Sequence, residues 1–390
     1  MQYELKGNWN YPSDIRAGAG FVEQLATCCK ALGMSKPLLI TDPGLADLAM
    51  VKMALARCRA EGTPVELFSN IKANPTGENV ADGLAAYNKG GHSGIIAFGG
   101  GSAMDAAKAT ALMVGQHRPL WDFEDEGDNW QRVNESGVAP IIAIPTTAGT
   151  GSEVGRAAVI TDTTHQRKRI IFHPKIQPQI VILDPELTLS LPAAITAATG
   201  MDALSHNLEA FCSPGYHPMA DGIAIEGIRL VKENLPTAVA DGNDITARMQ
   251  MLVASTMGAT AFQKGLGAMH ALAHPLGALY DAHHGLLNAI LMPYVLQANR
   301  DQITLKIARL ARYLELENPG YDSFQRWVLQ LRESVGIPHS LAEIGIDECE
   351  SDRVGQMASE DGSAGGNPIC FSAVEYATIF SRAVNGELAV

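Results

Sequence analysis

The spacing of hydrophobic positions changes about halfway along this chain. In the first half, short apolar runs that end in turn residues alternate with longer stretches of helical periodicity. The apolar runs predict strands at residues 37–41, 65–68, 94–98, 139–144 and 179–183. Two of the stretches between them predict helices at 45–61 and 77–89. This alternation predicts an α/β domain in which a parallel sheet carries helices on both faces.

The second half has a different pattern. From about Pro192 onward, alanine, leucine and methionine recur with helical periodicity, and few segments resemble strands. The change falls after Asp184-Pro-Glu. We therefore expect an α/β domain over residues 1–187 and an all-helical domain over 188–390.

Composition and charge narrow the possible functions. The 390 residues are 46% hydrophobic and 18% charged, as in a soluble two-domain protein. The net charge of −13 (29 basic minus 42 acidic residues) argues against nucleic acid or an anionic membrane as partner. We find no secretory signal and no apolar stretch long enough to span a membrane. Six cysteines without a C-x-x-C pair favour reduced thiols in a cytoplasm.

A histidine-rich segment, residues 265–292, is the most informative part of the chain. It places His270, His274, His283 and His284 among glycine, alanine and leucine, where imidazoles are expected to be buried and to need partners. His270 and His274 share one face of a helix because they are four residues apart. The pair could bind a metal, move protons or form a satisfied pair in the core.

A second motif lies upstream, in a segment with helical periodicity. Asp202 and His206 are also four residues apart, so both could point at one ion. Alone, this spacing usually marks a surface pair. Together with the histidine-rich segment it suggests a site of one carboxylate and two or three imidazoles, which suits Fe(II), Zn(II), Mn or Co.

A glycine-rich turn follows the third predicted strand. The segment 99–108, G-G-G-S-A-M-D-A-A-K, opens a helix, and such a turn can bring backbone N–H groups close to a phosphate. It lacks both the G-x-G-x-x-G fingerprint and the Walker lysine, so a purely structural turn is the alternative. The sequence Gly18-Ala-Gly20 is not a second candidate, since we expect no strand before it and interpret it as a loop into a helix.

Two further features sit at the ends of predicted strands. The hydroxyl-rich loop 145–153 follows the fourth strand and could face the same crevice as the glycine-rich turn. Asp42 ends the first strand, where a carboxylate can accept from a ribose 2′-OH and repel a 2′-phosphate. The sequence therefore favours NAD over NADP, although both features could be ordinary turns.

These motifs together give the chain a family resemblance. It contains, in order, G-G-G-S-x-x-D-x-A-K, P-T-T-A-G-T-G-S-E, D-P-x-L, G-x-D-A-L-x-H-x-x-E-A and H-A-x-A-H-P-L-G-A…H-G. Nearly end to end, it resembles the iron-containing (group III) alcohol dehydrogenases. The resemblance implies a Rossmann-like nucleotide-binding domain followed by a helical metal-binding domain, the dehydroquinate synthase-like architecture, with the active site in the cleft between them.

The resemblance also assigns residues to roles. The family's metal ligands fall on Asp202, His206, His270 and His284. His283 is then only a neighbour of a ligand. His274 matches a histidine near substrate and nicotinamide, which makes it the candidate catalytic residue, as a proton relay or as a group that positions substrate and nicotinamide.

The cofactor positions are implied in the same way. The pyrophosphate would lie on Gly100, Gly101 and Ser102, with Asp105 close by. Asp42 matches the position associated with NAD preference. Further matched contacts are Thr146, Thr147, Thr150 and Lys168.

The implied activity is that of a metal-dependent, NAD-linked alcohol dehydrogenase or aldehyde reductase. A hydride would pass between a metal-bound primary alcohol (a short alcohol, a diol or an ω-hydroxy acid) and the nicotinamide. Fe(II) is the expected metal with Zn(II) as the alternative, and a homodimer or higher homo-oligomer is expected. Arg156 is a candidate for binding a substrate carboxylate.

Other functions remain open from the sequence. Glycerol dehydrogenase, maleylacetate reductase and a dehydroquinate synthase-like lyase would use the same scaffold. A metallohydrolase or a nucleotide sensor without turnover would be a different class.

Overall fold

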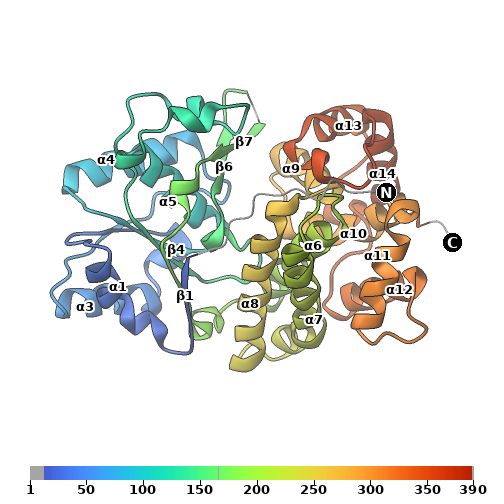
Figure 1. Cartoon of the computed structure of the whole chain (residues 1–390), viewed down its shortest axis with the longest axis horizontal. Coiled ribbons are helices and arrows are strands. Elements are labelled where there is room, and N and C mark those ends of the chain that lie inside the picture. The colour runs from blue at the N-terminus through green and yellow to red at the C-terminus, as the bar shows by residue number, and fades with distance from the viewer. Residues whose placement is uncertain (1–12, 166, 389–390) are drawn as a thin grey trace. The chain divides into compact units, whose positions relative to one another are not determined.

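The computed structural model describes residues 13–165 and 167–388, which form two compact units (Figure 1). The sheet unit contains, of the described residues, 13–147 and 151–190. The helical unit contains 148–150 and 191–388.

A six-stranded parallel sheet forms the centre of the sheet unit. The strands are β1 (Asp14–Ala17), β2 (Leu38–Ile40), β3 (Glu66–Phe68), β4 (Ile95–Gly99), β5 (Ile141–Pro145) and β8 (Ile180–Leu183). Their order across the sheet is β1-β8-β5-β4-β2-β3, and every pairing is parallel. Strands β2, β4, β5 and β8 are buried along their whole length, as expected for strands covered on both faces.

The α-helices of the sheet unit lie between its parallel strands in the sequence. They are α1 (Leu25–Ala31), α2 (Pro43–Ala46), α3 (Ala49–Ala60), α4 (Gly77–Gly90) and α5 (Gly101–Met113). The prediction of one continuous helix over 45–61 is wrong. Asp42 and Pro43 start α2 early as N-cap and first helical residue, and the extended backbone of Leu48 (φ −70°, ψ 151°) separates α2 from α3.

Two elements of the sheet unit differ from the sequence prediction. Strand β1 directly precedes Gly18, so the expectation that no strand lies before this loop is wrong. The loop closes around the buried carboxylate of Asp184, which accepts from Gly20 N at 3.1 Å and Val22 N at 3.0 Å. The sequence analysis also did not predict the antiparallel hairpin of β6 (Ala157–Asp162) and β7 (Arg167–Phe172).

The regular elements of the helical unit are all helices within residues 191–388. Its α-helices are α6 (Ala193–Cys212), α7 (Pro218–Ala240), α8 (Ile245–Ala261), α9 (Ala268–Tyr280), α10 (His284–Ala298), α11 (Arg300–Tyr313), α12 (Tyr321–Ser334), α13 (Ser351–Glu360) and α14 (Ala373–Asn385). Helix α6 packs against α7, α8 and α10 (Figure 1). It is buried almost throughout, which its largely apolar composition allows.

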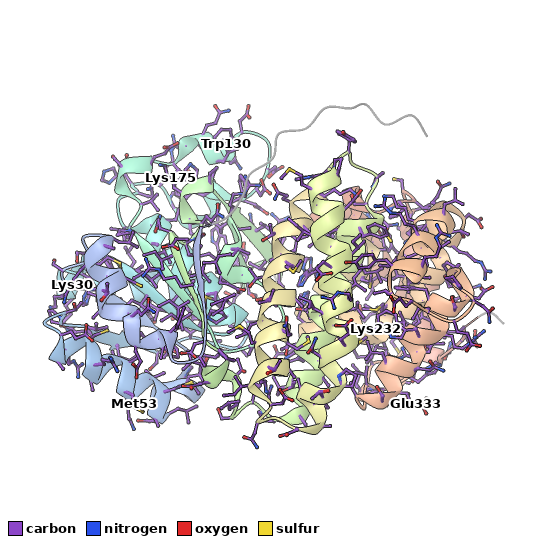
Figure 2. The ribbon with its side chains drawn as sticks, turned by 60° about the horizontal axis from the view of Figure 1, so that its bottom comes forward. Lys30, Met53, Trp130, Lys175, Lys232 and Glu333 are labelled. Carbon is purple, nitrogen blue, oxygen red and sulfur yellow. The ribbon has the colours of Figure 1, made fainter. Side chains whose placement is uncertain are left out.

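The outer surface carries the expected charged side chains. Lys30 on the sheet unit and Glu333 on the helical unit are exposed, as is the apolar Met53 (Figure 2). In the described part of the chain, every helix is too short or too polar to cross a bilayer.

A buried ammonium fixes the loop after β5 to helix α5. Lys108 Nζ donates to Ser152 O (3.0 Å), Ser152 Oγ (2.6 Å) and Ala157 O, and lies 3.2 Å from an Asp105 oxygen. The Asp105 carboxylate in turn accepts from Ser152 Oγ (2.5 Å) and Val159 N (2.9 Å). This network therefore sets the position of the hydroxyl-rich loop on the sheet unit.

Replacing Lys108 with Met should destabilise the sheet unit, because the mostly buried Asp105 would lose its positive partner. We expect the free energy of unfolding to fall by about 3 kcal/mol, measured by urea unfolding followed by circular dichroism. Lys89→Met, at an exposed position of α4, is the control and should change it by less than about 0.5 kcal/mol. Equal unfolding midpoints for Lys108→Met and wild type would contradict this role.

Candidate metal centre and cofactor loops

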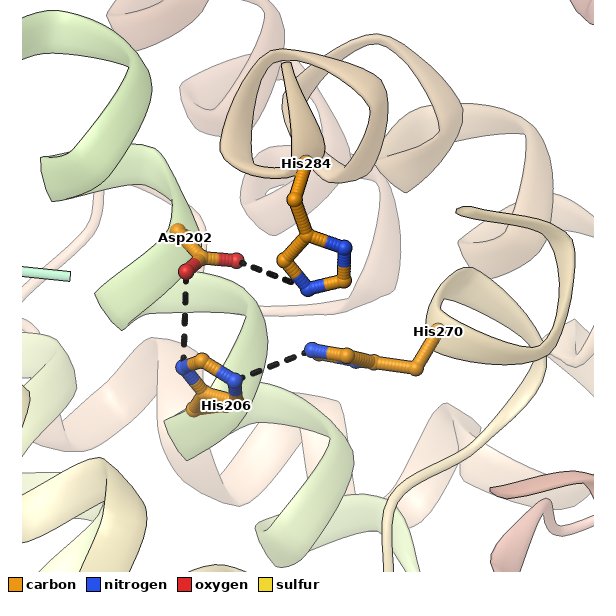
Figure 3. Close-up of side chains that lie close together, drawn as sticks. All are labelled: Asp202, His206, His270 and His284. Atoms are coloured by element: carbon orange, nitrogen blue, oxygen red, sulfur yellow. Dashed lines mark hydrogen bonds and ion pairs between the residues drawn. The ribbon is translucent and has the colours of Figure 1, made fainter. Parts of the chain in front are cut away.

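Three helices bring the four sequence-predicted metal ligands together (Figure 3). Helix α6 supplies Asp202 and His206 from one face, since they are one turn apart. Helix α9 supplies His270, and α10 begins at His284. One potential ligand atom of each residue lies within 4.8 Å of the others.

Three short interatomic distances connect the carboxylate and the imidazoles of this cluster. Asp202 Oδ2 lies 4.0 Å from His206 Nδ1, and Asp202 Oδ1 lies 3.8 Å from His284 Nε2. His206 Nε2 is 3.0 Å from His270 Nε2 (Figure 3). Asp202, His206 and His270 are buried, and His284 is partly exposed. The cluster thus offers one carboxylate and three imidazoles within a small volume.

Hydrogen bonds outside the cluster fix which ring nitrogens carry protons. His270 Nδ1 lies 2.6 Å from Glu209 Oε2, and an ionised carboxylate can only accept, so His270 Nδ1 is the donor. His206 Nδ1 donates to the Gly149 carbonyl at 3.3 Å, by the same reasoning. In neutral rings, both Nε2 atoms therefore present lone pairs to each other across 3.0 Å.

Two facing lone pairs at that distance repel unless a positive charge lies between them. A proton on one ring or a metal ion bound by both would supply this charge. Asp202 and His284 lie around the same space, which makes a divalent cation the better fit to the whole donor set. Nitrogen and oxygen donors of this kind suit Fe(II) and Zn(II) alike, so the set does not choose between them.

The pKa values of the two facing imidazoles are shifted in opposite directions. Burial lowers the pKa of His206 to about 4, so this ring is neutral near pH 7. Burial also acts to lower the pKa of His270, but the charge and hydrogen bond of Glu209 outweigh it, and the pKa is raised. In the absence of a metal, a proton shared by the pair would therefore be held mainly on His270.

The remaining two histidines of the segment occupy different places. His274 lies one turn beyond His270, and its ring stacks on His284 with 5.5 Å between centroids. Its Nδ1 is 2.8 Å from Asp361 Oδ2. His283 is exposed and caps α10 by accepting from Leu286 N at 3.3 Å, and it is not part of the four-residue group.

Asn288 is a further polar residue at the cluster that the sequence analysis did not single out. It is fully buried on α10, one turn after His284. Its Nδ2 donates to Asp202 Oδ1 at 2.9 Å and lies 3.2 Å from the Nε2 atoms of both His270 and His284. A polar side chain inside an apolar helix was the signal that could have identified it.

Glu209 and Asn367 hold the start of α9 in place. Glu209 accepts from Gly267 N (2.9 Å) and Met269 N (2.7 Å), in addition to His270. Asn367 Oδ1 accepts from Ala268 N at 3.1 Å. Glu209 belongs to a family motif and had no predicted role. It lies three residues after His206, on the same face of the helix, and this spacing was the signal that could have identified it.

The predicted cofactor loops follow three adjacent strands of the sheet unit. Asp42 lies just after β2, Gly100 after β4 and Thr146 after β5, and the strand order places β2, β4 and β5 side by side. Because these strands are parallel, all three loops lie at the same edge of the sheet. The connection from β3 back to β4 crosses to the other side of β2, and such a reversal is where dinucleotides bind in sheets of this type.

The glycine-rich turn has the backbone geometry that the sequence suggested. Gly99 has φ 147°, which favours glycine, and a Cβ there would lie 2.8 Å from the Ala103 Cβ. No side chain of the described residues caps the first turn of α5, which leaves the N-terminal N–H groups of Gly101 and Ser102 to another partner. A Cβ on Gly100 would come within 3.3 Å of Thr147 Oγ1, so the two loops are close.

The other sequence-predicted cofactor residues differ in the contacts that they make. Both Asp105 oxygens are engaged within the sheet unit, so the structure gives this residue a scaffold role and its direct contact with cofactor stays a prediction. Asp42 caps α2 by accepting from Leu45 N at 3.2 Å. Lys168 pairs with Thr161 in the hairpin, and Thr150 belongs to the short segment assigned to the helical unit.

Two family profiles cover most of the chain. The profile described as iron-containing alcohol dehydrogenase matches residues 12–185. The profile described as Fe-containing alcohol dehydrogenase family, C-terminal, matches residues 196–384. Together they span both units.

Individual relatives agree with the profiles. A 4-hydroxybutyrate dehydrogenase from Cupriavidus necator is 38% identical over 96% of this chain and 99% of its own length. An NAD-dependent methanol dehydrogenase from Bacillus methanolicus is 34% identical over 97% of this chain and 100% of its own. The crystal structure of a 1,3-propanediol oxidoreductase is 34% identical, covers 96% of this chain and 99% of its own, and superposes with a TM-score of 0.91. The chain belongs to the iron-containing alcohol dehydrogenase family and is an oxidoreductase of that type.

Proposed function

We propose that this chain catalyses the reversible, NAD-linked oxidation of a primary alcohol to an aldehyde at a divalent metal centre. One observation carries the proposal: the Nε2 lone pairs of His206 and His270 face each other at 3.0 Å, beside Asp202 and His284. A metallohydrolase or a nucleotide sensor would not account for the family membership. The decisive test mixes the protein with Fe(II) or Zn(II), NAD and a panel of primary alcohols, and follows the absorbance of reduced nicotinamide.

The proposed ligands are Asp202, His206, His270 and His284, and the proposed metal is Fe(II), with Zn(II) as the alternative. When bound, such an ion would supply Lewis-acid polarisation of an alcohol or aldehyde oxygen. Glu209 and the Gly149 carbonyl hold two imidazoles in the tautomer that leaves Nε2 free to bind it. Elemental analysis of freshly purified protein identifies the native metal.

The cofactor proposed for the sheet unit is NAD. The first turn of α5, with Gly100, Gly101 and Ser102, suits the pyrophosphate because its N–H groups are uncapped. Asp42, at the end of β2, suits the adenosine ribose. The further proposed contacts are Thr146, Thr147, Thr150 and Lys168.

The proposed substrates are short alcohols, diols and ω-hydroxy acids. The names of the three relatives cover these classes, with methanol, 1,3-propanediol and 4-hydroxybutyrate. Arg156 is half-buried and packs over Phe172, with 5.6 Å between Cζ and the ring centroid, and could bind the carboxylate of a hydroxy acid. Glycerol and maleylacetate belong in the same panel, because glycerol dehydrogenases and maleylacetate reductases are the alternatives on this scaffold.

We also propose that the enzyme works in the cytoplasm as a homodimer or a higher homo-oligomer. All six cysteines are free, and Cys349 and Cys370 are exposed, which suits a reducing compartment. Light scattering coupled to size-exclusion chromatography measures the oligomeric state directly.

Replacing His270 with Ala should remove the metal together with turnover. We expect bound metal to fall below one-tenth of the wild-type content and turnover to fall at least about a hundredfold, since a lost Lewis acid removes several kcal/mol of transition-state stabilisation. Elemental analysis and nicotinamide absorbance measure the two effects. His283→Asn, which can still cap α10, is the control and should retain both. Full activity of His270→Ala with unchanged metal content would contradict the assignment.

The close approach of α10 to α6 should also control metal affinity. A Cβ on Gly285 would lie 2.6 Å from Ala198 O and 3.0 Å from the Asp202 Cβ. Gly285→Ala should therefore push His284 away from Asp202 and weaken metal binding at least about tenfold, the scale seen when a ligand is misplaced. Competition with a chelator measures the affinity.

The matched control for Gly285→Ala is Gly222→Ala on α7, where an added Cβ meets nothing within 4 Å. This control should bind metal as the wild type does. Equal metal affinities for Gly285→Ala and Gly222→Ala would show that the contact between α6 and α10 does not set the site.

Replacing Asp42 with Ser should shift cofactor preference towards NADP. The hydroxyl can still cap α2, but the negative charge that would repel a 2′-phosphate is lost. We expect the ratio of kcat/KM for NADP to that for NAD to rise at least about tenfold, equivalent to 1.4 kcal/mol. Asp47→Ser, an exposed acidic residue just after α2, is the control. An unchanged ratio would place the ribose elsewhere.

A further inference from the structure

The carboxylate of Asp361, in the loop after α13, contacts His274, which is not one of the four proposed metal ligands. The Asp361 Oδ2 atom lies 2.8 Å from His274 Nδ1, and both side chains are mostly buried, at 16% and 13% exposed. Asp361 is 87 residues from His274 in the sequence and follows α13.

The carboxylate is itself held in a fixed orientation. Its other oxygen, Oδ1, accepts from Ser363 N at 2.8 Å, and Ala364 N donates to the Asp361 carbonyl at 3.0 Å. The same loop continues to Asn367, which binds Ala268 N at the start of α9. One loop thus contacts α9 at two places, at its first turn and at His274.

The hydrogen bond between Asp361 and His274 determines which nitrogen of the imidazole carries the proton. An ionised carboxylate is an acceptor only, so His274 Nδ1 carries the proton and a neutral ring has its lone pair on Nε2. Two ring contacts also hold the His274 imidazole. It stacks on His284, with 5.5 Å between centroids and 14° between planes, and meets the His270 ring edge-on, with 6.0 Å between centroids and 68° between planes. Hydrogen bond and ring contacts together leave little freedom for rotation.

We infer that Asp361 is a positioning residue that fixes the tautomer and orientation of His274, so that Nε2 is the ring nitrogen directed to the reacting groups. The consequence for turnover rests on the proposed alcohol dehydrogenase function. The tautomer itself does not, and can be measured without any substrate.

The first experiment reads the tautomer of His274 by NMR in Zn(II)-loaded protein with ¹⁵N-labelled histidine. Two-bond proton–nitrogen correlations distinguish an Nδ1–H from an Nε2–H ring, and the signals missing from His274→Gln assign the residue. We expect Nδ1–H in the wild type and a gain of Nε2–H in Asp361→Ala. An Nε2–H ring in the wild type, or an unchanged Nδ1–H ring in Asp361→Ala, would overturn the inference.

The second experiment measures turnover with NAD and 1,3-propanediol. We expect Asp361→Ala to lower kcat about 10- to 100-fold, with bound zinc and the KM for NAD unchanged. Asp361→Asn keeps the shape of the side chain but has only one acceptor oxygen. With that oxygen on Ser363 N, its NH2 group faces His274 Nδ1 and favours the Nε2–H ring, so kcat should fall as in Asp361→Ala. Glu360→Gln, an exposed neighbour, should behave as the wild type.

The outcomes distinguish the positioning role of Asp361 from the proposed function. If Asp361→Ala loses zinc or unfolds, the properly folded Asp361→Asn decides, and loss of zinc there as well would make the residue merely structural and overturn the inference. If the wild type has no turnover with any alcohol but the tautomer shifts as expected in Asp361→Ala, the proposed function fails and the positioning role stands.

Discussion

The proposed metal cluster depends on the requirement that polar groups inside an apolar helix find partners. Helix α6 is buried almost throughout, yet it carries Asp202, His206 and Glu209. Each unpaired group would cost several kcal/mol, so the surrounding helices must supply partners at defined positions. Glu209 meets this requirement by binding three donors at the start of α9, which places His270 against His206.

This arrangement makes the helical unit a support for the four proposed metal ligands. Glu209 on α6 fixes the tautomer of His270. Asn367, in the loop after α13, holds the first turn of the helix that carries His270. His284 sits at the first turn of α10, and its neighbour Gly285 permits the close approach to Ala198 and Asp202. The positions of the four proposed ligands are therefore set by contacts with residues outside that group, as is common around metal sites.

The sheet unit follows a different principle, in which backbone geometry matters more than side-chain chemistry. Three loops meet at one edge of the sheet because their strands are parallel and adjacent. The buried Lys108 and Asp105 then fix the loop after β5 to α5. A residue that resembles a ligand contact in the sequence, such as Asp105, can thus serve chiefly to hold the loops that carry the contacts.

The sequence by itself determined the parallel sheet, the helical second half and, through the family motifs, the candidate oxygen and nitrogen donors. Periodicity and the spacing of Asp202 from His206 are local properties, and each is visible in a few consecutive residues. The short hairpin β6–β7 and the strand before Gly18 were missed, because short strands carry little periodic signal. The break at Leu48 was missed because the apolar pattern continues across it.

The tertiary structure showed the different surroundings of the four histidines, which the family motifs had given different roles. His270, His274, His283 and His284 share one segment, and their residue types are identical. Their neighbours come from α6 and from the loop after α13, residues about 60 to 90 positions distant. Such contacts have no local pattern, so the pairing of Glu209 with His270 and of Asp361 with His274 becomes visible only when the chain is folded.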